Sequence, residues 1–116
     1  DPNEVKVVTN KRNEAIYFSR EAIPSRSKYK EKISKLKQVC IISFKRDFLI
    51  KFNEMTQTPL EIIESIDMLR VVENDEIVKM ILTETKTWSV DTKEDLIKVE
   101  KKMKNDNLLK AYINKK

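Results

Sequence analysis

The segment from Thr58 to Arg70 constrains the fold most, because it combines a complete helix start with a broad apolar face. Thr58 can cap the helix, Pro59 suits its first position, and Glu61 follows at the spacing of a capping box. Apolar residues then recur at helical spacing, at Ile62, Ile63, Ile66, Leu69 and Val72. We predict one helix that ends near Glu73 and whose apolar face is covered by strands. On pattern alone, this is a core helix without chemistry of its own.

The chain of 116 residues contains no glycine and no histidine, and both absences exclude kinds of site within it. Without histidine it can form neither a His-based catalytic triad nor a histidine metal site. Without glycine it has no Gly-rich phosphate loop, so such a loop, if the protein uses one, is expected outside this chain. The single cysteine, Cys40, stands in an apolar run and is expected to be a buried, reduced thiol.

Apolar and polar patterns divide the remaining sequence into strands and helices. Strands are expected over residues 5–9, 15–20, 38–44, 77–83 and 88–90, a short helix from Asp47 through Met55, a last helix that begins at Asp91 or Thr92 and runs to Met103, and a weaker pattern over 105–116. The run 38–44 is apolar almost throughout, as is typical of a central strand covered on both faces. Strands that alternate with helices predict a single α/β domain, residues 1–116, with a mixed sheet flanked by helices.

The charge pattern does not favour a nucleic-acid partner. Lysine and arginine exceed aspartate and glutamate by 24 to 19, and five lysines fall within residues 28–37. Acidic residues are interspersed with them, and no known nucleic-acid-binding motif accompanies them, so we predict a solvated charged face. No apolar run approaches the roughly 20 residues that a membrane span needs, and no signal peptide is recognisable. We therefore expect a soluble, cytoplasmic protein with no membrane partner.

Four blocks of residues carry a resemblance to a known family. The blocks are residues 1–8 (DPNEVKVV), Tyr17–Arg20 with Ile23 and Pro24, Pro59–Glu61 running on to Leu69 and Arg70, and Val90–Thr92 with Glu94–Leu96. In order and spacing they resemble the C-terminal half of CMP-sugar synthetases, most closely the 3-deoxy-manno-octulosonate cytidylyltransferase (CMP-Kdo synthetase) family. The resemblance covers nearly the whole chain. It implies part of a nucleotidyltransferase-type fold, with the N-terminal nucleotide-binding half absent from this chain.

The resemblance also implies a reaction and three site residues. In the family, a hydroxyl of an acidic sugar attacks the α-phosphate of CTP, pyrophosphate leaves, and Mg²⁺ neutralises charge, as a step in lipopolysaccharide biosynthesis. Asp91 matches an aspartate that helps to hold magnesium, Arg20 an arginine that contacts the acidic sugar, and Asp67 a glutamate that reaches the sugar hydroxyls. Without the family, Asp91 is better interpreted as a helix cap, and the other two as surface charges.

Three positions depart from the family pattern. Gln38, our remaining candidate for substrate binding, stands where the family has a sugar-binding histidine. Ile42 replaces a pocket tyrosine, and Met68 replaces a glutamine. These changes remove polar groups, so the resemblance implies either a different sugar or a degraded site.

Two hypotheses follow, and they belong to different classes. The chain is either the C-terminal, sugar-binding and dimerisation portion of a cytidylyltransferase, inactive on its own, or a non-catalytic dimerisation or binding module derived from that family. Both include a homodimer. The candidate interface residues are Phe48, Leu49, Phe52 and Met55, which alternatively pack beneath the Pro59 helix within one chain.

Overall fold

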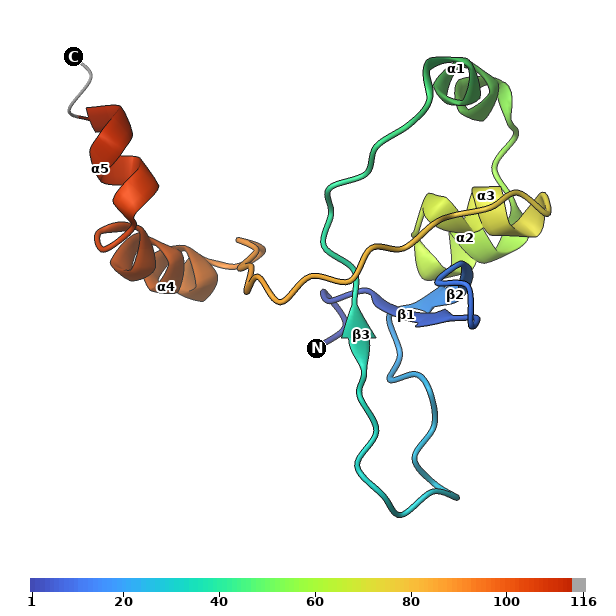
Figure 1. Ribbon diagram of the computed structural model, residues 1–116, viewed down its shortest axis with the longest axis horizontal. Coiled ribbons are helices and arrows are strands. Elements are labelled where there is room, and N and C mark those ends of the chain that lie inside the picture. Colours follow the sequence, from blue (N-terminus) through green and yellow to red (C-terminus); the bar gives the residue numbers. More distant parts are fainter. Residues whose placement is uncertain (114–116) are drawn as a thin grey trace. The chain divides into compact units, whose positions relative to one another are not determined.

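The structure, a computed structural model, describes residues 1–113 and divides the chain into two compact units, Asp1–Thr83 and Glu84–Lys116 (Figure 1). The sequence predicted a single domain over residues 1–116. The first unit contains β1 (Lys6–Thr9), β2 (Ala15–Ser19), β3 (Leu36–Lys37), α1 (Arg46–Glu54), α2 (Pro59–Glu64) and α3 (Met68–Glu73). The second contains α4 (Lys93–Met103) and α5 (Asn107–Ile113). Residues 114–116 of the predicted tail pattern lie outside the described residues.

The sheet of the first unit has the strand order β2-β1-β3. Val7 at its centre pairs with Phe18 on one side and with Leu36 on the other, and both pairings are antiparallel. The turn between β1 and β2 uses Asn13 at φ 57°, a conformation that asparagine tolerates better than most residues. The α/β class is confirmed. The strands that the structure describes all pair antiparallel, however, where the sequence predicted a mixed sheet.

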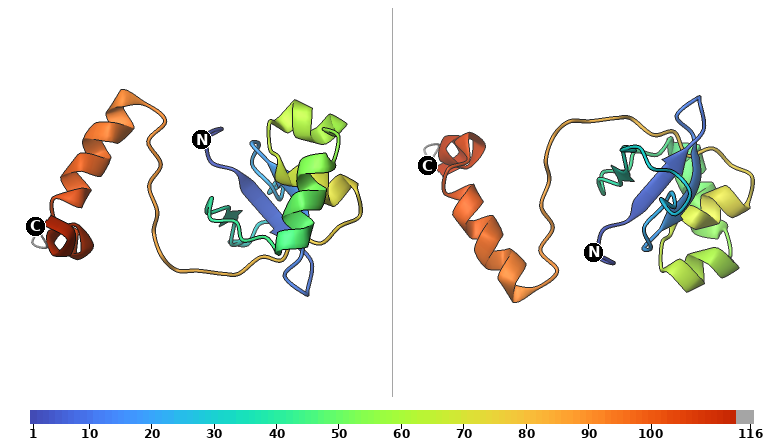
Figure 2. Two further views of the ribbon diagram at one scale, coloured as in Figure 1. Left: turned by 90° about the horizontal axis from the view of Figure 1, so that it is seen from above. Right: turned by 90° about the horizontal axis from the view of Figure 1, so that it is seen from below.

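The core of this unit lies between the strands and α3. Its buried apolar residues are Val7, Phe18, Ile66, Met68, Leu69 and Val71. In Figure 1 the helices of this unit lie above β1 and β2, and α3 contacts β2; Figure 2 shows the same unit from above and from below. An antiparallel sheet with one covered face is a common arrangement, because its other face can remain in water. The predicted covering of the Pro59 segment by strands is therefore confirmed for its second half, α3.

The single helix predicted over residues 58–73 is wrong, because the segment forms two short helices. Ser65 ends α2 in the left-handed region, at φ 54° and ψ 50°. The break resets the helical phase, so Ile66 and Leu69 are buried while Ile62 and Ile63 of the predicted stripe are 64% and 76% exposed. Glycine is the usual residue in this conformation, and a serine there gives no warning in the sequence.

The predicted strand over residues 38–44 is also wrong. β3 stops at Lys37, Cys40 is exposed rather than buried, and Ile41 is 84% exposed. A strand exists only where a neighbour supplies backbone hydrogen bonds, and no described strand lies beside 38–44.

The predicted strands over 77–83 and 88–90 do not form either. Within 77–83 there is only an isolated bridge, between Glu14 and Lys79. It is supported by the N–H of Ala15 donating to the carbonyl of Val78, at 2.9 Å. As at 38–44, an apolar β-prone sequence does not become a strand without a second one beside it.

The helix predicted from Asp47 forms as α1, but it begins at Arg46 and its N-cap is Lys45 without a side-chain hydrogen bond. In the second unit, the predicted last helix forms as α4. Thr92 rather than Asp91 is its cap, since its Oγ1 accepts a hydrogen bond from the N–H of Asp95 at 3.1 Å. None of the helices described is both long and apolar enough to cross a membrane.

Candidate functional site

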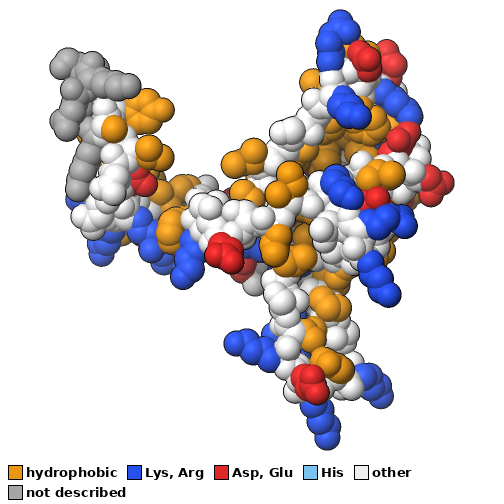
Figure 3. Space-filling model, viewed as in Figure 1, with side chains coloured by type: hydrophobic (Ala, Val, Ile, Leu, Met, Phe, Trp, Pro, Cys, Tyr) orange, Lys and Arg blue, Asp and Glu red, His pale blue; other side chains and the backbone are white. Residues whose placement is uncertain are grey.

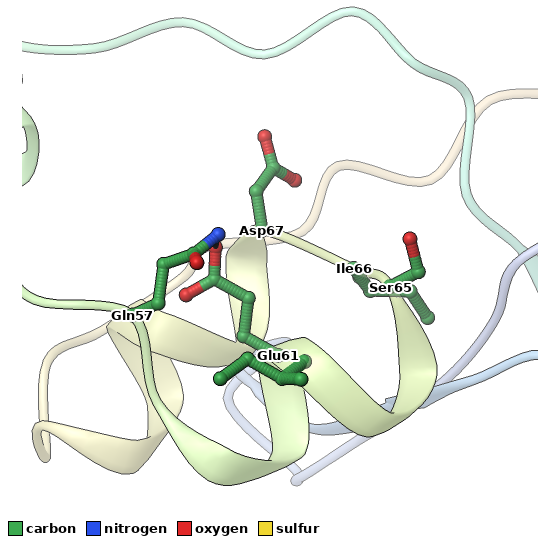
Figure 4. A pocket seen from close by; sticks show the side chains of 6 residues that line it. Gln57, Glu61, Ser65, Ile66 and Asp67 are labelled. Atoms are coloured by element: carbon green, nitrogen blue, oxygen red, sulfur yellow. Dashed lines mark hydrogen bonds between the residues drawn. The ribbon is translucent and has the colours of Figure 1, made fainter.

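A shallow hollow opens beside α2, at the turn that leads to α3 (Figure 4). It has a volume of about 400 Å³ and is lined by Gln57, Glu61, Ile62, Ser65, Ile66 and Asp67. Gln57 and Glu61 lie beside each other, while Asp67 extends away from them. The lining combines carboxylates, an amide, a hydroxyl and two isoleucines, which suits a polar ligand with some apolar surface.

A buried ion pair supports one side of this hollow. Arg70 of α3 donates to the Glu61 carboxylate through Nη2 at 2.5 Å and Nε at 2.8 Å. The Arg70 guanidinium also stacks over the Phe52 ring, at 4.6 Å from its centroid. The hydrogen bond from Arg70 is the main reason why the pKa of Glu61 is lowered, so this carboxylate is ionised at neutral pH.

The expected capping box of Thr58 and Glu61 is present at the start of α2, with its Thr58 side too loose to count as a hydrogen bond. Glu61 Oε2 accepts from the N–H of Thr58 at 3.3 Å, but the buried Thr58 hydroxyl has no hydrogen-bond partner among the described residues. The Glu73 carboxylate caps the helix instead, accepting from the N–H groups of Leu60 and Glu61 at 3.1 and 3.3 Å. The Glu73 contacts fix α2 against α3, because Glu73 is the last residue of α3.

Asp67 stands at the N-cap position of α3 and is exposed. Within the described part of the chain, no hydrogen bond or ion pair occupies its carboxylate. It therefore lines the hollow as an acceptor that is accessible to a ligand, in line with the role that the resemblance implies.

Arg20 is half-buried rather than the exposed strand-end charge that its position alone suggested. Its guanidinium donates from Nε to the carbonyl of Glu64 at 2.7 Å, from Nη2 to that of Ser65 at 3.0 Å, and from Nη1 to that of Pro2 at 3.0 Å. These contacts bring Arg20 to the same turn that carries Asp67. The two candidates are 47 positions apart in sequence. The fold brings Arg20 into contact with Ser65, which lines the hollow together with Asp67.

Glu64 is the residue that sequence reasoning missed. Its Oε1 accepts from the hydroxyls of Tyr17 at 3.0 Å and Ser19 at 2.9 Å, and its Oε2 from the N–H of Arg20 at 2.9 Å. The Arg20 amide is the largest of the causes that lower the pKa of Glu64. In the sequence, Glu64 is one polar position beside a helical stripe, and contacts 44 to 47 residues away leave no local signal.

The other two candidates, Gln38 and Asp91, make fewer contacts. Gln38 follows β3, is half-buried, and donates its backbone N–H to the carbonyl of Val5 at 2.8 Å. Asp91 lies in the second unit, exposed and next to the capped start of α4. Among residues 1–113 no three acidic, cysteine or histidine side chains are grouped closely enough to hold a metal ion.

Comparisons with known proteins give these features a context. The model of the family described as "Cytidylyltransferase" matches residues 1–81. The chain is 44% identical over 108 residues to the 3-deoxy-manno-octulosonate cytidylyltransferase of Fusobacterium nucleatum, covering 93% of this chain and 44% of that protein. It is 38% identical over 112 residues to the enzyme of the same name from Geobacter metallireducens, covering 88% of this chain and 44% of that protein.

A solved structure agrees. The structure of CMP:2-keto-3-deoxy-manno-octonic acid synthetase complexed with CTP superposes on this chain with a TM-score of 0.80 at 34% identity, covering 89% of this chain and 42% of that one. The chain thus spans less than half of the length of the relatives it matches. With a family model over most of its residues and the fold of a family member, the chain belongs to the cytidylyltransferase family.

Proposed function

We propose that this chain is the C-terminal, sugar-binding and dimerisation portion of an enzyme that transfers CMP from CTP to a Kdo-like acidic sugar. The observation that carries the proposal is the 44% identity, over 93% of this chain, to a protein named for that reaction. In the reaction, a sugar hydroxyl oxygen bonds to the α-phosphorus of CTP while the bond to pyrophosphate breaks. We propose that the portion is inactive alone, because a sequence without glycine contains no Gly-rich loop for the triphosphate.

The three candidates on the first unit have distinct tasks in this proposal. Arg20 offers a cation to the carboxylate of the sugar acid, for which a guanidinium fork is well suited. The exposed Asp67 carboxylate accepts hydrogen bonds from sugar hydroxyls and so orients the sugar. Gln38 supplies an amide where the family has a histidine, and with Ile42 and Met68 it points to an altered sugar preference.

Asp91 is proposed as one magnesium ligand. Its carboxylate is exposed, and no described residue pairs with it. Thr92 caps α4, so helix capping does not account for an aspartate at position 91. Magnesium in phosphoryl-transfer sites is commonly held by one or two carboxylates together with waters and substrate phosphates, so a single carboxylate from this chain fits. When bound, the metal would neutralise negative charge on the triphosphate.

A hybrid enzyme tests the proposal. The matched segment of the F. nucleatum cytidylyltransferase is replaced by this chain, and pyrophosphate release is measured with CTP, Mg²⁺ and Kdo for the hybrid, the unaltered relative and the 116-residue chain. We expect turnover by the hybrid and none by the chain alone. A folded hybrid without turnover would contradict the enzymatic proposal in favour of a non-catalytic module. Turnover by the chain alone would show that it is not an incomplete enzyme.

We also propose a homodimer, on a narrower surface than the sequence suggested. Phe48 and Phe52 are half-buried and pack with Phe44 within the chain, at ring distances of 6.2 and 5.4 Å. Leu49 and Ile50 of α1 are 42% and 46% exposed. Figure 3 shows hydrophobic side chains at the surface around α1 and along the segment that leads to it. The support is thus an exposed apolar face of α1, of the kind that marks protein–protein contacts.

Light scattering across a dilution series tests the dimer. We expect a mass above the 13.7 kDa of one chain, and a return to that mass in Leu49→Asp without loss of helical circular dichroism. Asn53→Asp, an added charge at an exposed polar position of the same helix, serves as the control and should leave the mass unchanged. Phe48→Asp should disturb folding itself. A mass of one chain at all micromolar concentrations would rule the dimer out.

A further inference from the structure

The end of α2 is fastened to the end of β2 by a single side chain. The Glu64 carboxylate accepts hydrogen bonds from Tyr17, Ser19 and the backbone N–H of Arg20, all between 2.9 and 3.0 Å. Tyr17 and Ser19 point to the same face of β2, because side chains alternate along a strand. The Glu64 carboxylate therefore binds two side chains of β2 and the next backbone amide at the same time. This fixes the direction in which the chain leaves the strand at Arg20.

The same residue holds the other end of Arg20. The backbone carbonyl of Glu64 accepts from Arg20 Nε at 2.7 Å, and the carbonyl of Ser65 accepts from Nη2. These carbonyls belong to the C-terminal end of α2 and would otherwise lack partners. Glu64 thus forms two kinds of hydrogen bond with Arg20: its side chain binds the Arg20 backbone amide, and its backbone carbonyl binds the Arg20 guanidinium.

Two features of this arrangement leave the guanidinium ready for an anion. A guanidinium has five N–H groups, of which three are used here, so one remains on each terminal nitrogen. All three partners are neutral carbonyls, and no described carboxylate forms an ion pair with Arg20. The Glu64 carboxylate instead accepts hydrogen bonds from the Arg20 amide and from two hydroxyls. The positive charge of Arg20 is therefore oriented by carbonyls. The Glu64 carboxylate interacts with it electrostatically but forms no hydrogen bond with the guanidinium.

We propose that Glu64 is a positioning residue that fixes Arg20 to receive the carboxylate of an acidic sugar. This inference rests on the proposed function and deepens it, by naming what keeps the binding arginine in place. Glu64 itself does not touch the sugar. Its removal should weaken binding of the sugar acid through a misplaced Arg20, and leave the CTP side of the reaction almost unchanged.

The experiment uses the hybrid enzyme and the variant Glu64→Gln, with Glu21→Gln as a matched control that changes the same charge next to Arg20 at an exposed position. KM for the sugar acid, KM for CTP and kcat are measured separately. Losing a hydrogen bond to a charged group lowers binding on the order of tenfold or more, so we expect the sugar KM to rise about tenfold. KM for CTP and kcat should stay within about threefold, and Glu21→Gln should behave as the parent.

Tyr17→Phe keeps the test decisive if Glu64→Gln does not fold. It removes one of the hydrogen bonds to Glu64 without altering charge, and we expect a smaller rise, about threefold, in the sugar KM alone. An unchanged sugar KM in the folded Glu64→Gln hybrid, or equal losses for both substrates and kcat, would overturn the positioning role. If Glu64→Gln is unfolded, an unchanged sugar KM in Tyr17→Phe overturns it. An inactive parent hybrid would instead refute the proposed function, and this inference with it.

Discussion

Removing one charge of the Glu61–Arg70 pair should destabilise the unit Asp1–Thr83 more than removing both. The Glu61 side chain is 5% exposed and that of Arg70 14%, so both charges are largely out of water. Arg70→Met leaves a buried carboxylate whose remaining partners are the Thr58 N–H and the Gln57 amide, at 3.3 and 3.4 Å. These two contacts are too long to compensate a buried negative charge.

The magnitude follows from this burial. Breaking a buried ion pair by removing one partner costs about 3–5 kcal/mol. A unit the size of Asp1–Thr83 has a total stability of roughly 4–12 kcal/mol, so Arg70→Met should remove a large part of it. Glu61→Gln should cost near the lower end, about 3 kcal/mol, because the amide is neutral and Arg70 keeps its contacts to the carbonyls of Phe52 and Met55. The double variant Glu61→Met/Arg70→Met should cost less than either single one.

Urea unfolding followed by far-ultraviolet circular dichroism measures these differences. Trp88 fluorescence is unsuitable, because that residue lies in the other unit. Asp47→Asn is the control, since the Arg46–Asp47 pair is almost fully exposed and its loss should not move the midpoint. Single variants that cost less than about 1 kcal/mol, or a double variant that costs the sum of the two, would refute the reasoning.

Acid should act on the same pair. Because the pKa of Glu61 is lower in the folded than in the unfolded chain, its contribution to stability is complete above the unfolded value of about 4.3. That contribution is lost as the pH falls through the lower, folded pKa. The urea concentration at the unfolding midpoint, measured at decreasing pH from pH 6, should therefore decrease once the pH is below about 4. Arg70→Met should flatten this dependence. An equally steep fall in Arg70→Met would assign the acid sensitivity to other groups.

Two further predictions concern single carboxylates. Hydrogen bonds, of which the one from Arg12 has the largest effect, lower the pKa of Glu14 to about 2, so a carbon-13 NMR titration of its carboxyl should have its midpoint there. Arg12→Ala should raise this pKa, and Lys11→Ala should leave it unchanged. Asp91→Asn in the hybrid enzyme should lower magnesium-dependent turnover by more than about tenfold. The unfolding midpoint should not change, because Thr92 and not Asp91 caps α4. Turnover within about twofold of the parent would leave Asp91 without a metal role.

Local patterns in the sequence predicted those elements whose stabilising contacts are local. The hairpin of β1 and β2 and the helix α4 form where the alternation of side chains and the capping residues predicted them. The break at Ser65 escaped prediction because serine only rarely adopts a left-handed conformation. The strand predicted over 38–44 failed for a different reason, since its sequence is suitable but the described chain offers it no partner.

The candidate site divides in the same way. Arg20, Asp67 and Asp91 were named through a family resemblance, and no periodicity or charge pattern singled them out. The fold adds that Arg20 binds the backbone of the turn that also carries Asp67. Glu64 was beyond sequence reasoning, since its importance consists entirely of contacts to β2 and to Arg20, the residue after β2.

The turn between α2 and α3 owes its shape to three carboxylates, which fix α2 at its start, its middle and its end. A helix of six residues is too short to be stable alone in water, so α2 depends on tertiary contacts. Glu73 caps its first turn, Glu61 ties its middle to α3, and Glu64 ties its end to β2. The left-handed Ser65 then follows from a fixed helix end on one side and the buried Ile66 on the other. Because binding groups act best on a backbone that does not move, this turn is a suitable platform for a ligand.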